Sequence, residues 1–311
     1  MRGKLQPFLV LLGAGILLFL GRHLFRESEF VTWGLTFGGT TAAGLLGMAL
    51  YRVQLELRAS RQELAMKQAE LNFALQVQRA LFPREFPVDR GLEFSGVCVP
   101  ARGISGDYFD VVPLTNGCVV FAIADISGKG ISAAILMSNL QAVLRILANS
   151  GHSPGEVCAR LNLHLNQVTD GGRFATIFYA EWNPESRLLR YVNAGHNAPL
   201  LLEEGSVEQI DPCAPPLGLF LESEFQVGER TLKPGSVMAL YSDGLSEAGI
   251  DRGREYGETR LAAIVTEHAC KPLAEIQHHV LDSVHQWAGQ ELEDDLTLLL
   301  VRATVPRKEA V

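Results

Sequence analysis

Two uncharged apolar runs lie close to the N-terminus, at residues 5–21 and 30–51. As helices they would be ~26 and ~33 Å long, which is close to the ~30 Å hydrocarbon core of a bilayer. A cleaved signal peptide is the alternative for the first run, but no small-residue cleavage site follows it. We therefore expect two transmembrane helices that form a hairpin over residues 1–51.

Residues 52–82 contain neither Gly nor Pro and are expected to form one long helix that closes at Pro83. Leu57, Leu64 and Leu71 recur every seven residues, as in the seam of a coiled coil. Such a helix can also pack on its own domain. Because no other apolar surface lies beside it in the sequence, we expect a membrane-proximal coiled coil that forms a homodimer. Its continuity with residues 78–82 predicts that dimer geometry influences the domain that follows.

Beyond Pro83, apolar patterns typical of strands and of helices occur in blocks. Helices are expected over Ile131–Asn149, from a capping box at Ser153 to about Val168, and over 259–288. Strands are expected at 92–99, 118–124, 174–182, 187–193, 199–203, 236–241 and 296–303. The block order indicates an α+β domain with largely antiparallel sheets over residues 83–305, followed by a tail at 306–311.

Charge is divided unevenly along the chain. It has 27 Lys and Arg against 35 Asp and Glu, a net charge of −8. Basic residues dominate residues 1–80, and acidic residues dominate residues 81–311. More basic residues flank the outer ends of the predicted hairpin than lie in its loop, 22–29, which places both termini in the cytoplasm. The acidic balance excludes a typical nucleic-acid binder, and the five scattered cysteines form neither a zinc nor a disulfide pattern.

Aspartates follow or precede several buried strands. Asp125 and Asp243 end apolar strands beside glycines, Asp294 and Asp295 precede the last strand, and Asp107 precedes Val111–Val112. Any one of them can be a turn residue or a helix cap. If their strands share a sheet, however, the carboxylates converge and repel one another unless cations neutralise them. Such an all-oxygen set suits Mg²⁺ or Mn²⁺, and two such ions can activate water for attack on a phosphoryl group.

Six ordered motifs resemble the SpoIIE-type (RsbU-like) bacterial branch of the PPM metal-dependent serine/threonine protein phosphatases. The resemblance covers roughly residues 75–305 and implies an αββα sandwich of two antiparallel sheets flanked by helices. It also implies hydrolysis by a metal-bound water without a phosphoenzyme. The motifs are GISGDYFD (103–110), DISGKG (125–130), AGHNAPLLL (194–202), PLG (216–218), YSDGLSEA (241–248) and DDLTLLLV (294–301).

The resemblance implies a site with two Mn²⁺ or Mg²⁺ ions. Asp125 would bridge them, the Ile126 carbonyl would be a further ligand, and Asp107, Asp243 and Asp294 would complete the carboxylate shell. Asp294 is preferred to Asp295 because it matches the first residue of the family's Asp-[Asp/Asn]-x-Thr.

Other positions near these motifs receive other expectations. Arg102 is a candidate for binding substrate phosphate, with an exposed solvated arginine as the alternative, and Asp110 is expected to be structural. Ser127 stands where eukaryotic PPM enzymes have a histidine, so their proposed general acid is missing. His196 is expected to fix a turn instead of replacing it.

The expected function is therefore that of a phosphoserine/phosphothreonine protein phosphatase anchored in the bacterial inner membrane, with its catalytic domain in the cytoplasm. The resemblance implies a phosphorylated anti-sigma-factor antagonist (STAS-type) protein as substrate. The expected partners also include membrane lipid and a second copy of the chain. The alternatives are a non-catalytic membrane signalling module and a membrane-bound nucleotide cyclase, although the chain lacks the Gly-Gly-Asp-Glu-Phe-like cyclase signature.

Overall fold

The structure is a computed structural model that describes residues 13, 15, 16, 19, 20, 29–88, 90–101, 103–169, 172–289 and 292–305. The predicted helix 5–21 lies mostly outside the described residues, and the loop residues 22–28 and the tail 306–311 lie wholly outside them. The chain divides into two compact units, Met1–Glu70 and Leu71–Val311.

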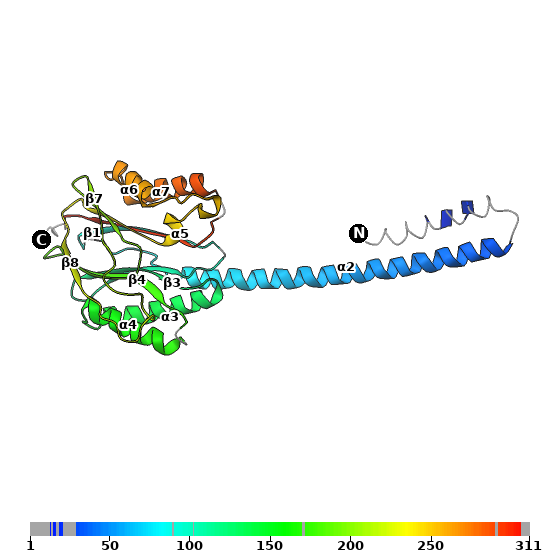
Figure 1. Ribbon diagram of the computed structural model, residues 1–311, viewed down its shortest axis with the longest axis horizontal. Coiled ribbons are helices and arrows are strands. Elements are labelled where there is room, and N and C mark those ends of the chain that lie inside the picture. The colour runs from blue at the N-terminus through cyan, green and yellow to red at the C-terminus, as the bar shows by residue number, and fades with distance from the viewer. Residues whose placement is uncertain are drawn as a thin grey trace. The chain divides into compact units, whose positions relative to one another are not determined.

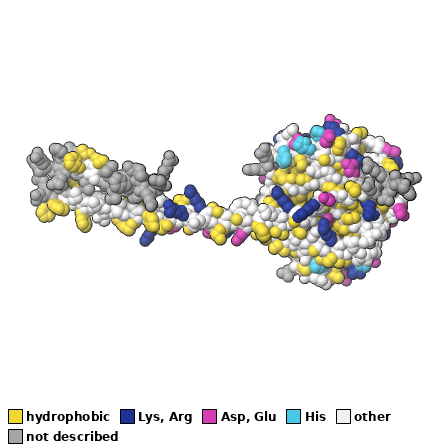
Figure 2. Space-filling view, turned by 180° about the vertical axis from the view of Figure 1, so that it is seen from behind, with side chains coloured by type: hydrophobic (Ala, Val, Ile, Leu, Met, Phe, Trp, Pro, Cys, Tyr) yellow, Lys and Arg dark blue, Asp and Glu magenta, His cyan; other side chains and the backbone are white. Residues whose placement is uncertain are grey.

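Residues Glu29–Arg79 form one continuous helix of 51 residues, α2 (Figure 1). It contains the predicted span 30–51 and most of the predicted linker 52–82. Many of its apolar side chains are not covered within the chain, as Figure 2 shows, and the exposed fractions of Trp33, Leu57 and Leu64 are 75%, 48% and 64%.

Among the described residues, α3 (Ile131–Ala148) is the helix that is long and apolar enough to cross a bilayer, and it is partly buried in the globular unit. α2 is long enough, but none of its described segments is as apolar as this requires. The predicted membrane hairpin and the predicted coiled coil therefore stay predictions.

Two five-stranded sheets form the centre of the unit Leu71–Val311, and their strands pair antiparallel throughout. Sheet one has the order β1-β10-β9-β6-β7, and sheet two has the order β2-β3-β4-β5-β8. The strands are β1 Leu92–Val99, β2 Asp107–Pro113, β3 Val119–Ile126, β4 Ala175–Asn183, β5 Leu188–Ala194, β6 Leu200–Glu203, β7 Ser206–Gln209, β8 Gly228–Thr231, β9 Val237–Tyr241 and β10 Leu296–Ala303.

Helices cover the two outer faces of this pair of sheets (Figure 1). α3 and α4 (Pro154–Val168) pack on sheet two, while α6 (Glu258–Glu267) and α7 (Leu273–Ala288) lie over sheet one. The result is a four-layered α+β sandwich, so the predicted arrangement of two antiparallel sheets flanked by helices is confirmed.

Three apolar clusters hold the layers together. The central cluster joins the inner faces of the sheets and includes Phe121, Phe178 and Trp182. A second lies between sheet two and α3/α4, and a third between sheet one and α6/α7. Each fully buried side chain of this size contributes roughly 1.5–3 kcal/mol of transfer free energy, so the clusters fix the ends of the strands relative to one another.

The structure differs from the sequence prediction in three places in this unit. β2 runs from Asp107 to Pro113, whereas the sequence indicates a strand only at Val111–Val112. The predicted helical stretch 259–288 is two helices, because Pro272 caps α7 and has no N–H with which to continue α6. β7 and β8 are additional short strands whose side chains are mostly exposed, which explains why no apolar pattern indicates them. The predicted capping box is present, with the Ser153 side chain accepting from the Glu156 N–H.

Candidate active site

Asp107 and Asp125 face each other directly across two neighbouring strands. Asp107 opens β2, and its Cα partner in the antiparallel register of β3 is Asp125. The loop before Asp107 comes very close to Asp125, since a Cβ on Gly106 would lie 3.2 Å from the Ile126 carbonyl oxygen and 3.7 Å from Asp125 Oδ1. Gly106 therefore permits an approach that a side chain would obstruct, and it brings the Ile126 carbonyl beside the pair.

Asp243 and Asp294 lie at the corresponding end of sheet one. Asp243 is the first residue of the short helix α5 (Asp243–Ser246), directly after β9, and Asp294 comes just before β10. The two segments are hydrogen-bonded, because the Ser242 N–H donates to the Thr297 carbonyl at 3.0 Å and the Thr297 N–H donates to Ser242 Oγ at 2.9 Å. A Cβ on Gly244 would overlap the Asp295 carbonyl, so this close contact also depends on glycine.

The four carboxylates repel one another although they come from two sheets. Burial and the charge of Asp125 raise the pKa of Asp107 well above its usual value. Burial and the charge of Asp243 raise the pKa of Asp125 to about 7, and Asp294 contributes further. Burial and Asp294 also raise the pKa of Asp243. The structure thus brings the four predicted residues into one electrostatic cluster.

This donor set fits divalent cations that prefer oxygen ligands. Asp107 is only 2% exposed, and its Oδ2 has no hydrogen-bond partner among the described residues. A buried carboxylate oxygen without a partner is costly unless a cation satisfies it. In their present positions, however, no three acidic, histidine or cysteine side chains of the described residues enclose a single ion. The carboxylates are arranged as two pairs, Asp107 with Asp125 and Asp243 with Asp294.

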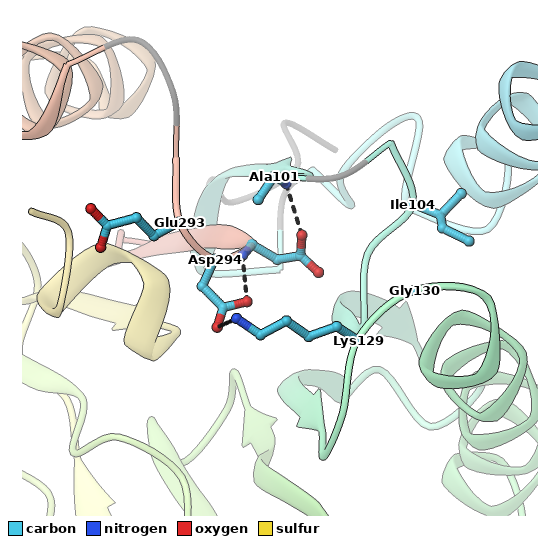
Figure 3. Close-up of a pocket in the computed structure, with 7 residues that line it drawn as sticks. Ala101, Ile104, Lys129, Gly130, Glu293 and Asp294 are labelled. Atoms are coloured by element: carbon cyan, nitrogen blue, oxygen red, sulfur yellow. Dashed lines mark hydrogen bonds and ion pairs between the residues drawn. The ribbon is translucent and has the colours of Figure 1, made fainter. Parts of the chain in front are cut away.

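Lys129 crosses from the loop ahead of α3 to Asp294, as Figure 3 shows. Its Nζ lies 2.5 Å from Asp294 Oδ2, while Asp294 Oδ1 accepts the Asp295 N–H at 2.9 Å. Both residues line a cavity of about 10 Å³ together with Ala101, Ile104, Gly130, Glu293 and Asp295. The Glu293 side chain points away from the Lys129–Asp294 pair (Figure 3).

The Asp295 side chain accepts hydrogen bonds from the backbone, whereas Asp294 belongs to the acidic cluster. Its two carboxylate oxygens accept the N–H groups of Ala101 and Gly106, at 2.8 and 2.9 Å. It thereby holds both ends of the loop that leads to Asp107. The choice of Asp294 over Asp295 as the candidate ligand stays a prediction.

The end of α2 holds the same loop from the other side. The buried Gln78 amide donates to the Ser105 carbonyl at 2.7 Å and accepts from the Ser105 N–H at 2.9 Å. Ser105 Oγ in turn accepts the Asp107 N–H at 2.9 Å. No local sequence signal indicates this contact, because Gln78 and Ser105 lie 27 positions apart.

The remaining candidates lie outside this cluster. Asp110 is fully buried, accepts from the Tyr108 hydroxyl and pairs with Arg145 of α3 at 2.6 Å, which is a structural arrangement. His196 is buried, with Nδ1 2.8 Å from Thr176 Oγ1, and burial lowers its pKa to about 4. Arg102 lies outside the described residues.

Comparison with known proteins identifies the fold and the family. The family described as Stage II sporulation protein E (SpoIIE) matches residues 115–304. The chain is 30% identical over 261 residues to the phosphoserine phosphatase RsbU of Bacillus subtilis, covering 83% of this chain and 76% of RsbU.

Solved structures with this fold include phosphatase domains. The RsbU and RsbW domains of Rv1364c from Mycobacterium tuberculosis align with a TM-score of 0.63 at 26% identity, covering 70% of this chain and 61% of that one. The SiaA-PP2C domain of Pseudomonas aeruginosa aligns with a TM-score of 0.67 at 20% identity, covering 76% and 98%. The catalytic domain of the phosphatase PstP, in complex with two manganese ions, aligns with a TM-score of 0.54 at 18% identity, covering 68% and 98%. The chain therefore belongs to the SpoIIE family and is a serine/threonine protein phosphatase of the RsbU kind.

Proposed function

We propose that this chain hydrolyses phosphoserine or phosphothreonine in a protein substrate, with two Mn²⁺ or Mg²⁺ ions at the Asp107–Asp125–Asp243–Asp294 cluster. The single observation that carries the proposal is the direct pairing of Asp107 with Asp125 beside the Asp243–Asp294 pair. Their mutual repulsion is what bound cations relieve. Similarity to RsbU supports the reaction class.

In this proposal each residue has a defined part. Asp125 pairs with Asp107 and is also influenced by the charges of Asp243 and Asp294. It would contact both ions, with Asp107, Asp243, Asp294 and the Ile126 carbonyl as the other ligands. When bound, such ions activate water and neutralise charge on the phosphoryl group. Asp295 and Gln78 position the loop that carries Asp107. His196, buried beside Thr176 with a lowered pKa, stays neutral and outside the proton transfer.

The proposed substrate is a phosphorylated anti-sigma-factor antagonist of the STAS type, whose dephosphorylation changes its binding partner. Two findings support this. The chain spans most of RsbU, and in Rv1364c an RsbU domain occurs in one chain with an RsbW domain.

We also propose that the chain is anchored in the bacterial cytoplasmic membrane by helices 5–21 and 30–51, with the unit Leu71–Val311 in the cytoplasm. The uncovered apolar side chains of α2 support this, because water does not accommodate such a surface well. The uncovered seam residues Leu57 and Leu64 support a homodimer through residues 52–82.

Exchange of the central carboxylates tests the catalytic proposal. Asp125→Asn and Asp243→Asn are expected to lower the rate on a phosphoserine protein by ~100-fold or more, because each removes charge from the ion site. EDTA should abolish the activity of the unaltered chain, and Mn²⁺ should restore it. Asp211→Asn, at an exposed position, is the matched control. Normal turnover by either site variant, with a native circular dichroism spectrum, would contradict the assignment.

A further inference from the structure

The contact between Lys129 and Asp294 joins the two halves of the site. Lys129 precedes α3 on the side of sheet two, whereas Asp294 precedes β10 of sheet one, and their charged atoms lie 2.5 Å apart (Figure 3). Burial and Asp294 raise the pKa of Asp243, and Lys129 offsets part of this rise, so its positive charge acts on both carboxylates of that pair. Lys129 is therefore a cation of the chain itself beside the carboxylates proposed to bind metal.

Both oxygens of Asp294 are engaged in this arrangement. Oδ1 accepts the Asp295 N–H, and Oδ2 contacts the Lys129 ammonium. A divalent cation at Asp294 needs at least one of these oxygens, and its positive charge repels the Lys129 ammonium beside Oδ2. Metal and ammonium thus compete for the same carboxylate.

The contact is of a kind that a metal ion can displace. The side chains of Lys129 and Asp294 are 49% and 38% exposed, and ion pairs in such positions are weak. The backbone beside Lys129 is held independently, since the Ser127 N–H donates to the Phe174 carbonyl and Ser127 Oγ accepts the Phe174 N–H. Rotation of the flexible lysine side chain is therefore enough to release Asp294.

We propose that Lys129 is a built-in competitor for the metal ion at Asp294 and sets the affinity of the site for that ion. The inference rests on the proposed function. In this proposal the Lys129 ammonium compensates the charge of Asp294 before the metal ion arrives, and it moves away when the ion binds.

The test is Mn²⁺ binding, measured by isothermal titration calorimetry on the full-length chain, solubilised in detergent and stripped of metal. Lys129→Gln is expected to bind the ion at Asp294 about tenfold more tightly, equivalent to ~1.4 kcal/mol of binding free energy. Lys129→Arg keeps the charge and should bind it no more tightly than the unaltered chain. The matched control is Lys233→Gln, which removes a lysine paired with Glu204 at 2.9 Å on another part of the surface. It should leave the affinity within about twofold, because screening weakens a distant charge.

The outcomes separate this inference from the proposed function. If the unaltered chain binds Mn²⁺ and Lys129→Gln binds it equally or more weakly, the inference is wrong and the metal site stands. An equal gain in Lys233→Gln would reduce the effect to net charge and also overturn the inference. If the unaltered chain binds no Mn²⁺, the proposed function and the inference both fail. Combining Lys129→Gln with Asp294→Asn should remove the gain in Mn²⁺ affinity, because the carboxylate for which lysine and metal compete is then absent.

Discussion

Asp294 and Asp295 are neighbours in the sequence, but their carboxylates have different partners. Asp295 accepts two backbone N–H groups of the loop before Asp107, whereas Asp294 contacts Lys129 and acts through its charge on Asp125 and Asp243. A carboxylate that already satisfies two amide donors has less capacity left for a metal. At the scale of single residues, hydrogen bonding thus separates a candidate ligand from a residue that positions the loop.

The pKa of His196 makes a prediction about stability and pH. Burial lowers this pKa to about 4, from the usual 6.5 of a histidine in water. As the pH falls through 6.5, the unfolded chain binds a proton at this residue and the folded chain does not. The contribution of His196 to the free energy of unfolding is therefore complete above pH 6.5 and is lost as the pH falls towards 4. The loss is up to roughly 3 kcal/mol. In urea unfolding of the metal-free chain, the stability difference between wild type and His196→Gln should shrink from pH 7.5 to pH 5.

The control for this prediction is His278→Gln on α7, where the side chain is 73% exposed. Its stability difference from the unaltered chain should change by less than ~0.5 kcal/mol between the two pH values. Direct observation of the His196 ring by NMR is independent of the variant. A ring that becomes protonated near pH 6.5 would refute the buried, neutral state.

The candidate ligands were predictable from the sequence, whereas their supporting contacts were not. Asp107, Asp125, Asp243 and Asp294 stand at strand ends within recognisable motifs. Strand pairing joins β2 to β3 and β9 to β10, but these pairs lie in two sheets and not in the one shared sheet that the sequence analysis assumed, so it is the packing of the sheets that brings the four together. The contact of Lys129 with Asp294 joins distant segments, and no local pattern of charge or hydrophobicity marks it.

At the scale of elements, burial explains part of what the sequence pattern revealed. The exception is β2, which is buried but was predicted only at Val111–Val112, because Asp107 and Asp110 interrupt its apolar run. β3 and β10 are almost wholly buried and appear as continuous apolar runs, so they were predicted within a residue or two. β7 is exposed throughout, and β8 nearly so, and both owe their existence to pairing with neighbouring strands. Helix starts were predictable where side-chain chemistry is local, as in the Ser153 capping box.

The end of α2 is an element whose effect on the site can be measured. Gln78→Ala removes both partners of the Ser105 backbone and leaves those buried groups unpaired, at a cost of about 1–3 kcal/mol in unfolding free energy. Because Ser105 Oγ accepts the Asp107 N–H, the loop loosens where the proposed ligand begins. We expect Mn²⁺ to bind several-fold more weakly, as calorimetry would measure.

Gln76→Ala is the control for this variant, since Gln76 lies on the same turn of α2 and is exposed. It should change neither stability nor Mn²⁺ affinity beyond experimental error. If Gln78→Ala loses stability but keeps full Mn²⁺ affinity, then the contact stabilises the fold without positioning Asp107.

At the scale of the whole molecule, the net charge of −8 is the sum of a basic and an acidic part of the chain. The first 80 residues are basic and apolar, as expected for a membrane anchor with basic flanks on the cytoplasmic side. The rest is acidic and includes the carboxylate cluster, whose repulsion bound divalent ions would offset. Charge therefore bears on placement and metal loading, and it does not define the protein substrate.

Truncation tests how these parts depend on each other. The compact unit begins at Leu71, within α2. A chain of residues 71–311 therefore keeps the hydrogen bonds between Gln78 and Ser105 and the contact between the rings of Phe82 and Phe109, whose centroids lie 5.2 Å apart. A chain that begins at residue 84 loses both. We expect residues 71–311 to be soluble and to keep full Mn²⁺ affinity, and residues 84–311 to bind Mn²⁺ more weakly and unfold at lower urea. The full-length chain should sediment with membranes. Equal affinity and stability of the two shorter chains would disprove the coupling through α2, whereas a full-length chain in the supernatant would disprove the anchor.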